Sequence, residues 1–137
     1  MTRDLPLRLN VMWDGNETDP ELMVSASAAT ITALGERLCD VTAAVVLPAA
    51  PSESTAWRRS LDWLRIELGD DESGSLRLSV SGDCLTICAD AATLRRLGKS
   101  LVSVFERGAV AGAHLHFDAI AGWTEDGGGQ LIVGVLT

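Results

Sequence analysis

Two stretches of this chain, LMVSASAATITALGERLCDV (residues 22–41) and LTICADAATLRRLGKSLVSV (residues 85–104), align without a gap at an offset of 63 residues. Nine of the twenty aligned positions are identical, which is more than chance predicts. We interpret the match as an internal duplication in which residues 5–68 and 76–137 each contain one ββαβ unit. At 137 residues, the two copies are expected to close into a single domain spanning residues 1–137.

Each copy changes from a strand pattern to a helix pattern. Alternating apolar residues predict a strand with one buried face at 84–89. Apolar residues then follow at helical spacing in the second copy, at Leu94, Leu97, Leu101 and Val104. The first copy repeats this stripe at Ile31, Leu34, Leu38 and Val41. We therefore expect one amphipathic helix in each copy.

Short polar residues and glycines mark equivalent places in the two helical segments. Ser27 and Asp90 stand where an N-cap side chain accepts a backbone N–H. Gly35 and Gly98 fall in mid-helix, where each costs up to about 1 kcal/mol relative to alanine. A close helix–helix or helix–sheet approach at both glycines would explain that cost.

Strand patterns elsewhere complete the predicted fold, at 7–13, 21–26, 64–68, 76–80, 114–118 and 130–136. The linker 49–63 is expected to hold a short helix with Trp57 and Leu61. The pattern predicts an α+β fold, with a mostly antiparallel sheet of about six to seven strands and two main helices on one face. The other face would be open to a partner or a second copy, with Trp13, Trp63 and Trp123 as candidates for it.

Composition and charge limit the classes of partner. The formal net charge of −8 argues against a nucleic-acid binder, which needs a Lys/Arg patch, and is compatible with a basic protein partner. No apolar run approaches the roughly 20 residues of a membrane helix. Three cysteines and no export signal predict a cytoplasmic protein with reduced thiols.

The segment HLHFD (114–118) is the strongest candidate for chemistry. Alternation on a strand places His114, His116 and Asp118 on one face, where they could bind a metal. The chain has no other histidine and no accompanying ligand motif. We therefore predict a sheet strand whose Leu115 and Phe117 fill the core, with no metal and no cofactor. No nucleophile elbow is present either, so no catalytic residue is assigned.

Two glycine-containing segments, GDDESG (69–74) and GGG (127–129), have the pattern of hairpin turns rather than of phosphate-binding loops. Their acidic neighbours form either a solvated rim or an acidic lip that covers a basic site on a partner: Asp70, Asp71, Glu72, Glu125 and Asp126. Arg95 and Arg96 lie on the polar face of the second helix and are expected to pair with nearby acids.

From residue 76 onward the order of features resembles the immunity protein 32 family of bacterial polymorphic-toxin systems. The resemblance consists of a Gly-Asp turn leading through a strand to a helix, an H-x-H strand, and a closing apolar strand after a glycine turn. The matching residues are Gly82, Asp83, Leu94, Leu97, Leu101, His114, His116 and Leu131 to Val133. Position 89, where the family pattern would have glycine, is Ala89.

This resemblance implies a non-catalytic antidote that protects the producing cell by binding a cognate toxin. The contacts that we assign to it are His114, His116, Asp118, Trp123, Glu125, Asp126 and the acidic segment Asp70, Asp71 and Glu72. Two other functions stay open from the residues alone. One is a metal-dependent enzyme or metal-binding module built on the His-x-His strand, and the other is a structural domain that forms a homodimer.

Overall fold

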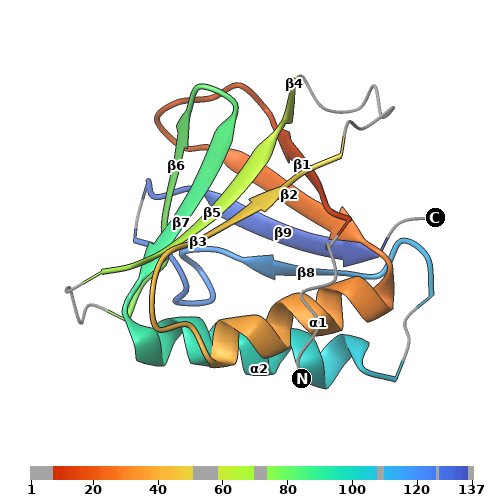
Figure 1. Ribbon diagram of the computed structural model, residues 1–137. Coiled ribbons are helices and arrows are strands. Elements are labelled where there is room, and N and C mark those ends of the chain that lie inside the picture. The colour runs from red at the N-terminus through yellow and green to blue at the C-terminus, as the bar shows by residue number, and fades with distance from the viewer. Residues whose placement is uncertain (1–7, 51–58, 70–73, 108–109, 126, 136–137) are drawn as a thin grey trace.

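The computed structural model describes residues 8–50, 59–69, 74–107, 110–125 and 127–135 (Figure 1). Within them lie two helices, α1 (Ala28–Cys39) and α2 (Ala91–Phe105). The strands are β1 (Asn10–Trp13), β2 (Glu21–Ala26), β3 (Val45–Pro48), β4 (Arg59–Leu61), β5 (Trp63–Leu68), β6 (Arg77–Ser81), β7 (Cys84–Ala89), β8 (His114–Phe117) and β9 (Gln130–Val135).

The strands form two mixed sheets, so the prediction of one mostly antiparallel sheet was wrong. One sheet has the order β4-β1-β2-β9-β8, and the other has the order β3-β5-β7-β6. Each contains one parallel pair, β2 with β9 and β5 with β7. The strand that follows each helix joins the sheet that contains the hairpin of the other half, so that β3 shares a sheet with β6 and β7, and β8 shares one with β1 and β2. Alternation in a sequence identifies a strand but does not identify its neighbours.

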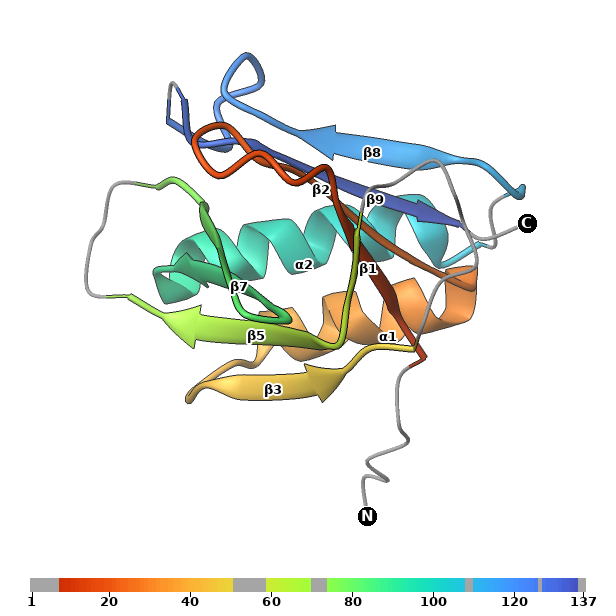
Figure 2. The same cartoon turned by 90° about the horizontal axis from the view of Figure 1, so that it is seen from above.

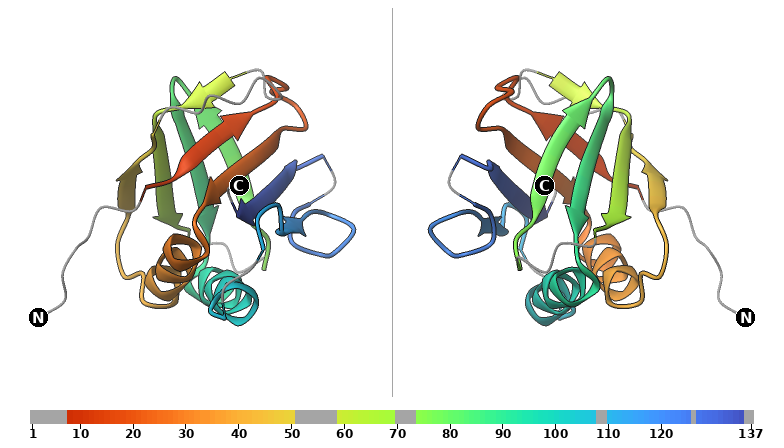
Figure 3. Two further views of the ribbon diagram at one scale, coloured as in Figure 1. Left: turned by 90° about the vertical axis from the view of Figure 1, so that its right-hand side faces the viewer. Right: turned by 90° about the vertical axis from the view of Figure 1, so that its left-hand side faces the viewer.

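The two helices lie side by side and cover the space between the sheets (Figures 2 and 3). Seen along the helices, the sheets spread apart above the helix pair, so that three layers enclose one core (Figure 3). The sheets contribute inward-facing residues such as Leu22, Val24, Leu64, Ile66, Leu85, Ile87, Leu131 and Val133. The helices contribute Ile31, Leu34, Leu38, Leu94, Leu97, Leu101 and Phe105.

The N-terminus of each helix is where the sequence predicts it. The Ser27 side chain accepts a hydrogen bond from the Thr30 amide (3.2 Å), which confirms it as the N-cap of α1. Asp90 occupies the N-cap position of α2, but its carboxylate accepts a hydrogen bond from the Thr93 hydroxyl (2.5 Å) and makes no cap hydrogen bond with a backbone amide. The predicted apolar stripe of α2 ends differently, because Phe105 is buried and Val104 is 44% exposed.

The helices cross at Gly35 and Gly98, as their mid-helix positions led us to expect. A Cβ atom on Gly35 would lie 2.7 Å from the Gly98 carbonyl oxygen, and one on Gly98 would lie 2.4 Å from the Gly35 carbonyl oxygen. Real Cβ atoms do not approach oxygen that closely, so only glycine fits at either position. Backbone-to-backbone contact offsets the poor helix propensity of both glycines.

The linker does not contain the expected helix around Leu61, which lies in β4 and is fully buried. Trp57 lies outside the described residues. Directly after β4 the chain passes to the second sheet, and the amides of Asp62 and Trp63 both donate to the Asp83 carbonyl oxygen (2.8 and 3.0 Å). These two hydrogen bonds hold the bend at Asp62 that separates β4 from β5.

Of the three tryptophans expected near an open sheet face, only Trp63 is found there. Its side chain is 46% exposed on the outer face of the β3-β5-β7-β6 sheet. Trp13 is buried in the core, and Trp123 packs against the core from the loop after β8.

Both halves of the chain have the same order of elements, a hairpin, a helix and then further strands. The hairpins are β1–β2 and β6–β7, and each leads into its helix. We propose that this order derives from the duplication of 5–68 and 76–137, joined in one domain. The equivalent placement of Gly35 and Gly98 at one crossing supports the proposal.

Replacing Gly35 or Gly98 with alanine is expected to destabilise the protein by about 1–3 kcal/mol, because overpacking outweighs the gain in helix propensity. Chemical denaturation measures the free energy of unfolding. Ala29→Gly, at an exposed position in the first turn of α1, is the control, and it should cost less than about 1 kcal/mol through propensity alone. Stabilisation by Gly35→Ala would contradict the close crossing.

The hydrogen bond from the Thr93 hydroxyl lowers the pKa of the Asp90 carboxyl from its ordinary value of 3.8. The stability that this carboxylate contributes is therefore complete above pH 3.8 and is lost as the pH falls through its lower folded pKa. Asp90→Asn should lower Tm at neutral pH, and its difference from the wild type should shrink in strong acid.

Thermal unfolding followed from neutral to strongly acidic pH checks this expectation. Asp19→Asn, in the exposed turn between β1 and β2, is the matched control. A Tm difference for Asp90→Asn that stays constant throughout the acid range would show that the carboxylate charge does not stabilise α2.

Candidate functional site

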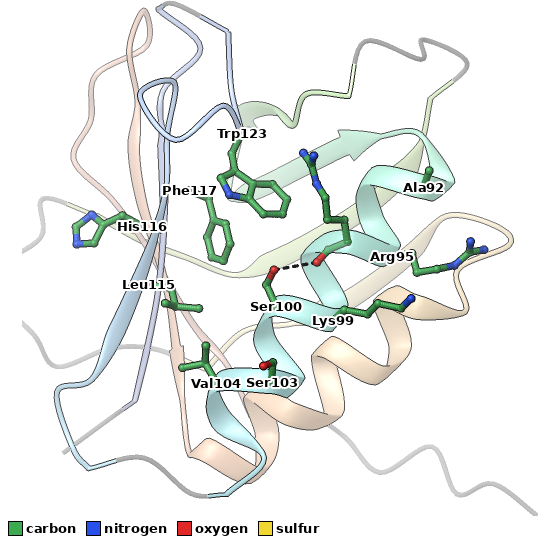
Figure 4. Close-up of a pocket in the computed structure, with 11 residues that line it drawn as sticks. Ala92, Arg95, Lys99, Ser100, Ser103, Val104, Leu115, His116, Phe117 and Trp123 are labelled. Atoms are coloured by element: carbon green, nitrogen blue, oxygen red, sulfur yellow. Dashed lines mark hydrogen bonds between the residues drawn. The ribbon is translucent and has the colours of Figure 1, made fainter.

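A groove of about 650 Å³ lies between α2 and the strand β8 (Figure 4). The helix side is formed by Ala92, Arg95, Arg96, Lys99, Ser100, Ser103 and Val104. The other side is formed by Leu115, His116, Phe117 and Trp123. Among the described residues, three cationic side chains and no acidic side chain line it. The whole chain has 19 acidic and 11 basic residues, so this groove differs in charge from the protein as a whole.

The periodicities of the two elements produce the groove. Leu94, Leu97 and Leu101 turn one face of α2 into the core, so Arg95 and Lys99 emerge on the opposite, exposed face. On β8 the side chains alternate, as the sequence predicts. Phe117 is buried and Leu115 is half-buried on the side facing α2, while the His116 ring points away from the helix (Figure 4).

Trp123 is held between an aromatic ring and a guanidinium group. Its ring meets that of Phe117 edge-on, with centroids 4.9 Å apart, and the Arg96 guanidinium lies 4.3 Å from its centroid. Arg96 also donates a hydrogen bond to the Gly74 carbonyl oxygen (3.1 Å). Within the described residues neither arginine pairs with an acid as expected, and the Arg96 side chain has these other partners instead.

The two histidines of HLHFD lie together on the outer face of β8. Their ring centroids are 4.9 Å apart. Nδ1 of His114 lies 2.9 Å from the Gly112 carbonyl oxygen, and Nδ1 of His116 lies 2.8 Å from Oε1 of Gln130. The Asp118 carboxylate instead accepts a hydrogen bond from the Ala121 amide (2.9 Å) in the turn after the strand. In the described part of the chain, no group of three or more His, Cys, Asp or Glu residues could hold a metal ion.

The predicted acidic lip is only partly visible. Glu125 is exposed, two residues after Trp123. The remaining members lie outside the described residues: Asp70, Asp71, Glu72 and Asp126. A separate cavity between the helices is lined by carboxylates at Glu36, Asp40 and Glu106 and also by Lys99, which therefore stands between a cationic and an acidic surface.

Sequence reasoning missed the groove itself. The available signal was LRRLGK (94–99), where Arg95, Arg96 and the only lysine of the chain fall within five positions. A second signal appears only in the structure. Three of the five exposed large apolar side chains among the described residues lie on α2 or next to the ends of β8: Val104 (44%), Val110 (81%) and Ile120 (99%). Of these three, Val104 lines the groove itself, and exposed apolar side chains that cluster are typical of a docking surface.

Residues 85–136 match the family model of immunity protein 32. This match confirms the resemblance that the same part of the sequence shows. The matched segment covers nearly all of β7 and the whole of α2, β8 and β9, and thus includes both sides of the groove. Searches of curated proteins and of solved structures gave no match. No helix within the described residues is long and apolar enough to cross a membrane.

Arg96 and Arg95 make a matched pair for testing the groove's internal contacts. Arg96→Met is expected to destabilise the protein by about 1 kcal/mol, since it removes the contact with Trp123 and the hydrogen bond to Gly74. Arg95→Met should change stability by less than about 0.5 kcal/mol, as is usual for exposed sites. Urea denaturation measures both. Equal effects of the two substitutions would contradict a structural role for Arg96.

Proposed function

We propose that this chain is an immunity protein that binds and neutralises a cognate bacterial toxin without catalysing a reaction. The observation that carries the proposal is the match of residues 85–136 to the immunity protein 32 family. The groove strengthens it, because the matched segment supplies both of its sides. Neutralisation of this kind requires a preorganised surface and slow dissociation, and it needs neither a metal nor a nucleophile.

In this proposal the protein acts in the cytoplasm of the producing cell, on a toxin that is basic overall. The net charge of −8 supports this choice of partner, because an acidic protein attracts a basic one over distances of about a Debye length and speeds their association. A toxin that acts on an anionic substrate would carry such a basic surface. Carboxylates of the antidote would then occupy positions meant for phosphates.

The contacts that we propose surround β8 and the loop after it. Trp123 and Glu125 lie close together in that loop, and His114, His116 and Asp118 precede them. Asp126 and the segment Asp70, Asp71 and Glu72 are proposed to extend the acidic part of this surface. Gly74, which follows that segment in the chain, is tied to Arg96 beside the groove, which supports the grouping.

Co-expression with the toxin encoded by the adjacent gene tests the proposal. The wild-type protein is expected to restore growth, and calorimetry with the inactivated toxin should show tight binding that weakens as salt is added. Glu125→Lys should slow association, because it reverses one of the steering charges. Glu17→Lys, in the exposed turn between β1 and β2, is the control at a distant site.

Toxin activity that is unchanged by an excess of the wild-type protein would overturn the proposed function. Binding that is tight but independent of salt would leave the function intact and remove the acidic contacts from it.

A further inference from the structure

The edge of the five-stranded sheet at β8 presents unpaired backbone groups. β8 is the last strand of this sheet and pairs only with β9 among the described strands. The Val135 amide donates to the Ala113 carbonyl oxygen (2.9 Å), which makes His114 and Gly134 a non-hydrogen-bonded pair of the antiparallel ladder. His116 and Ile132 are the next such pair. The N–H and C=O groups of His114 and His116 therefore point away from β9.

One of the two edge strands of the other sheet, β3, is protected where β8 is not. β3 pairs with β5, and the Ala49 amide donates to the Asp62 carbonyl oxygen (2.7 Å), so Pro48 and Trp63 are likewise a non-hydrogen-bonded pair. Pro48 thus stands where an outward N–H would otherwise be offered, and it has none to offer. Proline at an edge is a common protection against addition of a further strand. β8 (HLHF) contains no such residue.

The unprotected edge borders the groove, and the groove's chemistry indicates what fits there. Arg95 and Lys99 are exposed cations on the helix side. Val104 and Leu115 offer apolar surface between them and the strand. A chain that runs along β8 would place alternate side chains over α2, because successive residues of a strand point to opposite faces. Those side chains would combine apolar groups with carboxylates.

We propose that β8 accepts an extended acidic segment of the toxin as a sixth strand of the sheet, with its inward side chains lying in the groove. This inference deepens the proposed function and rests on it. Backbone hydrogen bonds to His114 and His116 supply affinity, and the charges of Arg95 and Lys99 select carboxylates. The toxin can still be basic overall, since long-range attraction depends on net charge and the fit at the groove depends on one segment.

Amide hydrogen exchange on the full-length protein, free and bound to the inactivated toxin, tests strand addition directly. In the free protein, the His114 and His116 amides should exchange fast, and those of Leu115 and Phe117 should be protected by β9. Binding should slow exchange at His114 and His116 by more than about tenfold, as new strand hydrogen bonds do. The two amides paired to β9 are controls within the same strand.

Substitutions distinguish the contribution of the backbone hydrogen bonds to affinity from the contribution of the charged side chains. His116→Pro removes an N–H that does not pair with β9, so the sheet should remain folded while affinity for the toxin falls about tenfold or more. His116→Thr loses the same ring but keeps the N–H, so it should bind the toxin about tenfold more tightly than His116→Pro does. Arg95→Glu with Lys99→Glu should weaken binding by more than about tenfold, whereas Arg107→Glu, exposed beyond the end of α2, should not.

Two results would overturn the inference while leaving the proposed function intact. In one, the wild type and His116→Pro bind the toxin equally well. In the other, affinity depends on Arg95 and Lys99, but the His114 and His116 amides exchange freely in the complex, which would indicate that the toxin contacts the groove through charge alone. Failure of the wild type itself to bind the toxin would overturn the proposed function and the inference together.

Discussion

The contact between Gly35 and Gly98 is the constraint on which the rest of the fold depends. Each glycine faces the carbonyl oxygen of the other at a distance that excludes a Cβ atom, so the two helix axes come as close as their backbones permit. The helices together form the third side of the core, below two sheets that diverge (Figure 3). A wider helix pair would leave the space between the sheets unfilled, and unfilled space in a core costs stability.

Exchange of strands between the halves makes this closure cooperative. The β1–β2 hairpin pairs with β9 from the end of the chain, and β5 from the first half pairs with the β6–β7 hairpin of the second. Neither half can therefore complete a sheet by itself. Pairing of distant segments slows folding, because a long loop must close before the contacts form. The result of this pairing is a single core to which both sheets and the helix pair contribute.

Much of this architecture could be predicted from local sequence, because it depends on local physics. Ser27 and Asp90 mark the helix starts, although only Ser27 makes a side-chain cap hydrogen bond, and alternation in HLHFD assigns the faces of β8. The prediction failed where an outcome depends on geometry beyond the segment. At 3.6 residues per turn the buried stripe of α2 passes from Leu101 to Phe105, which leaves Val104 exposed. β3 was missed because only four residues form it and two of them face outward.

The groove could not be predicted from the sequence, for a different reason. Arg95 and Lys99 occupy the polar face of a helix, and such residues are ordinarily solvated whatever the fold. They become one side of a site only because β8 crosses from the second half of the chain into the first sheet and stops beside α2. Partner strands and sheet order are tertiary facts, so no pattern within LRRLGK could reveal them. The only indication of the groove in the sequence was this cluster of positive residues in a chain whose net charge is negative.

Lys99 makes the groove chemically distinct from the rest of the protein surface. It is the only lysine among 137 residues, and it lies on α2 in the lining of the groove. Reagents that acylate or crosslink primary amines consequently have a single side-chain target, apart from the α-amino group. Any natural acylation of a lysine in this protein would fall on the same position, where it would remove one positive charge from the groove. Reagents specific for amines therefore modify the Lys99 side chain in this groove and no other side chain.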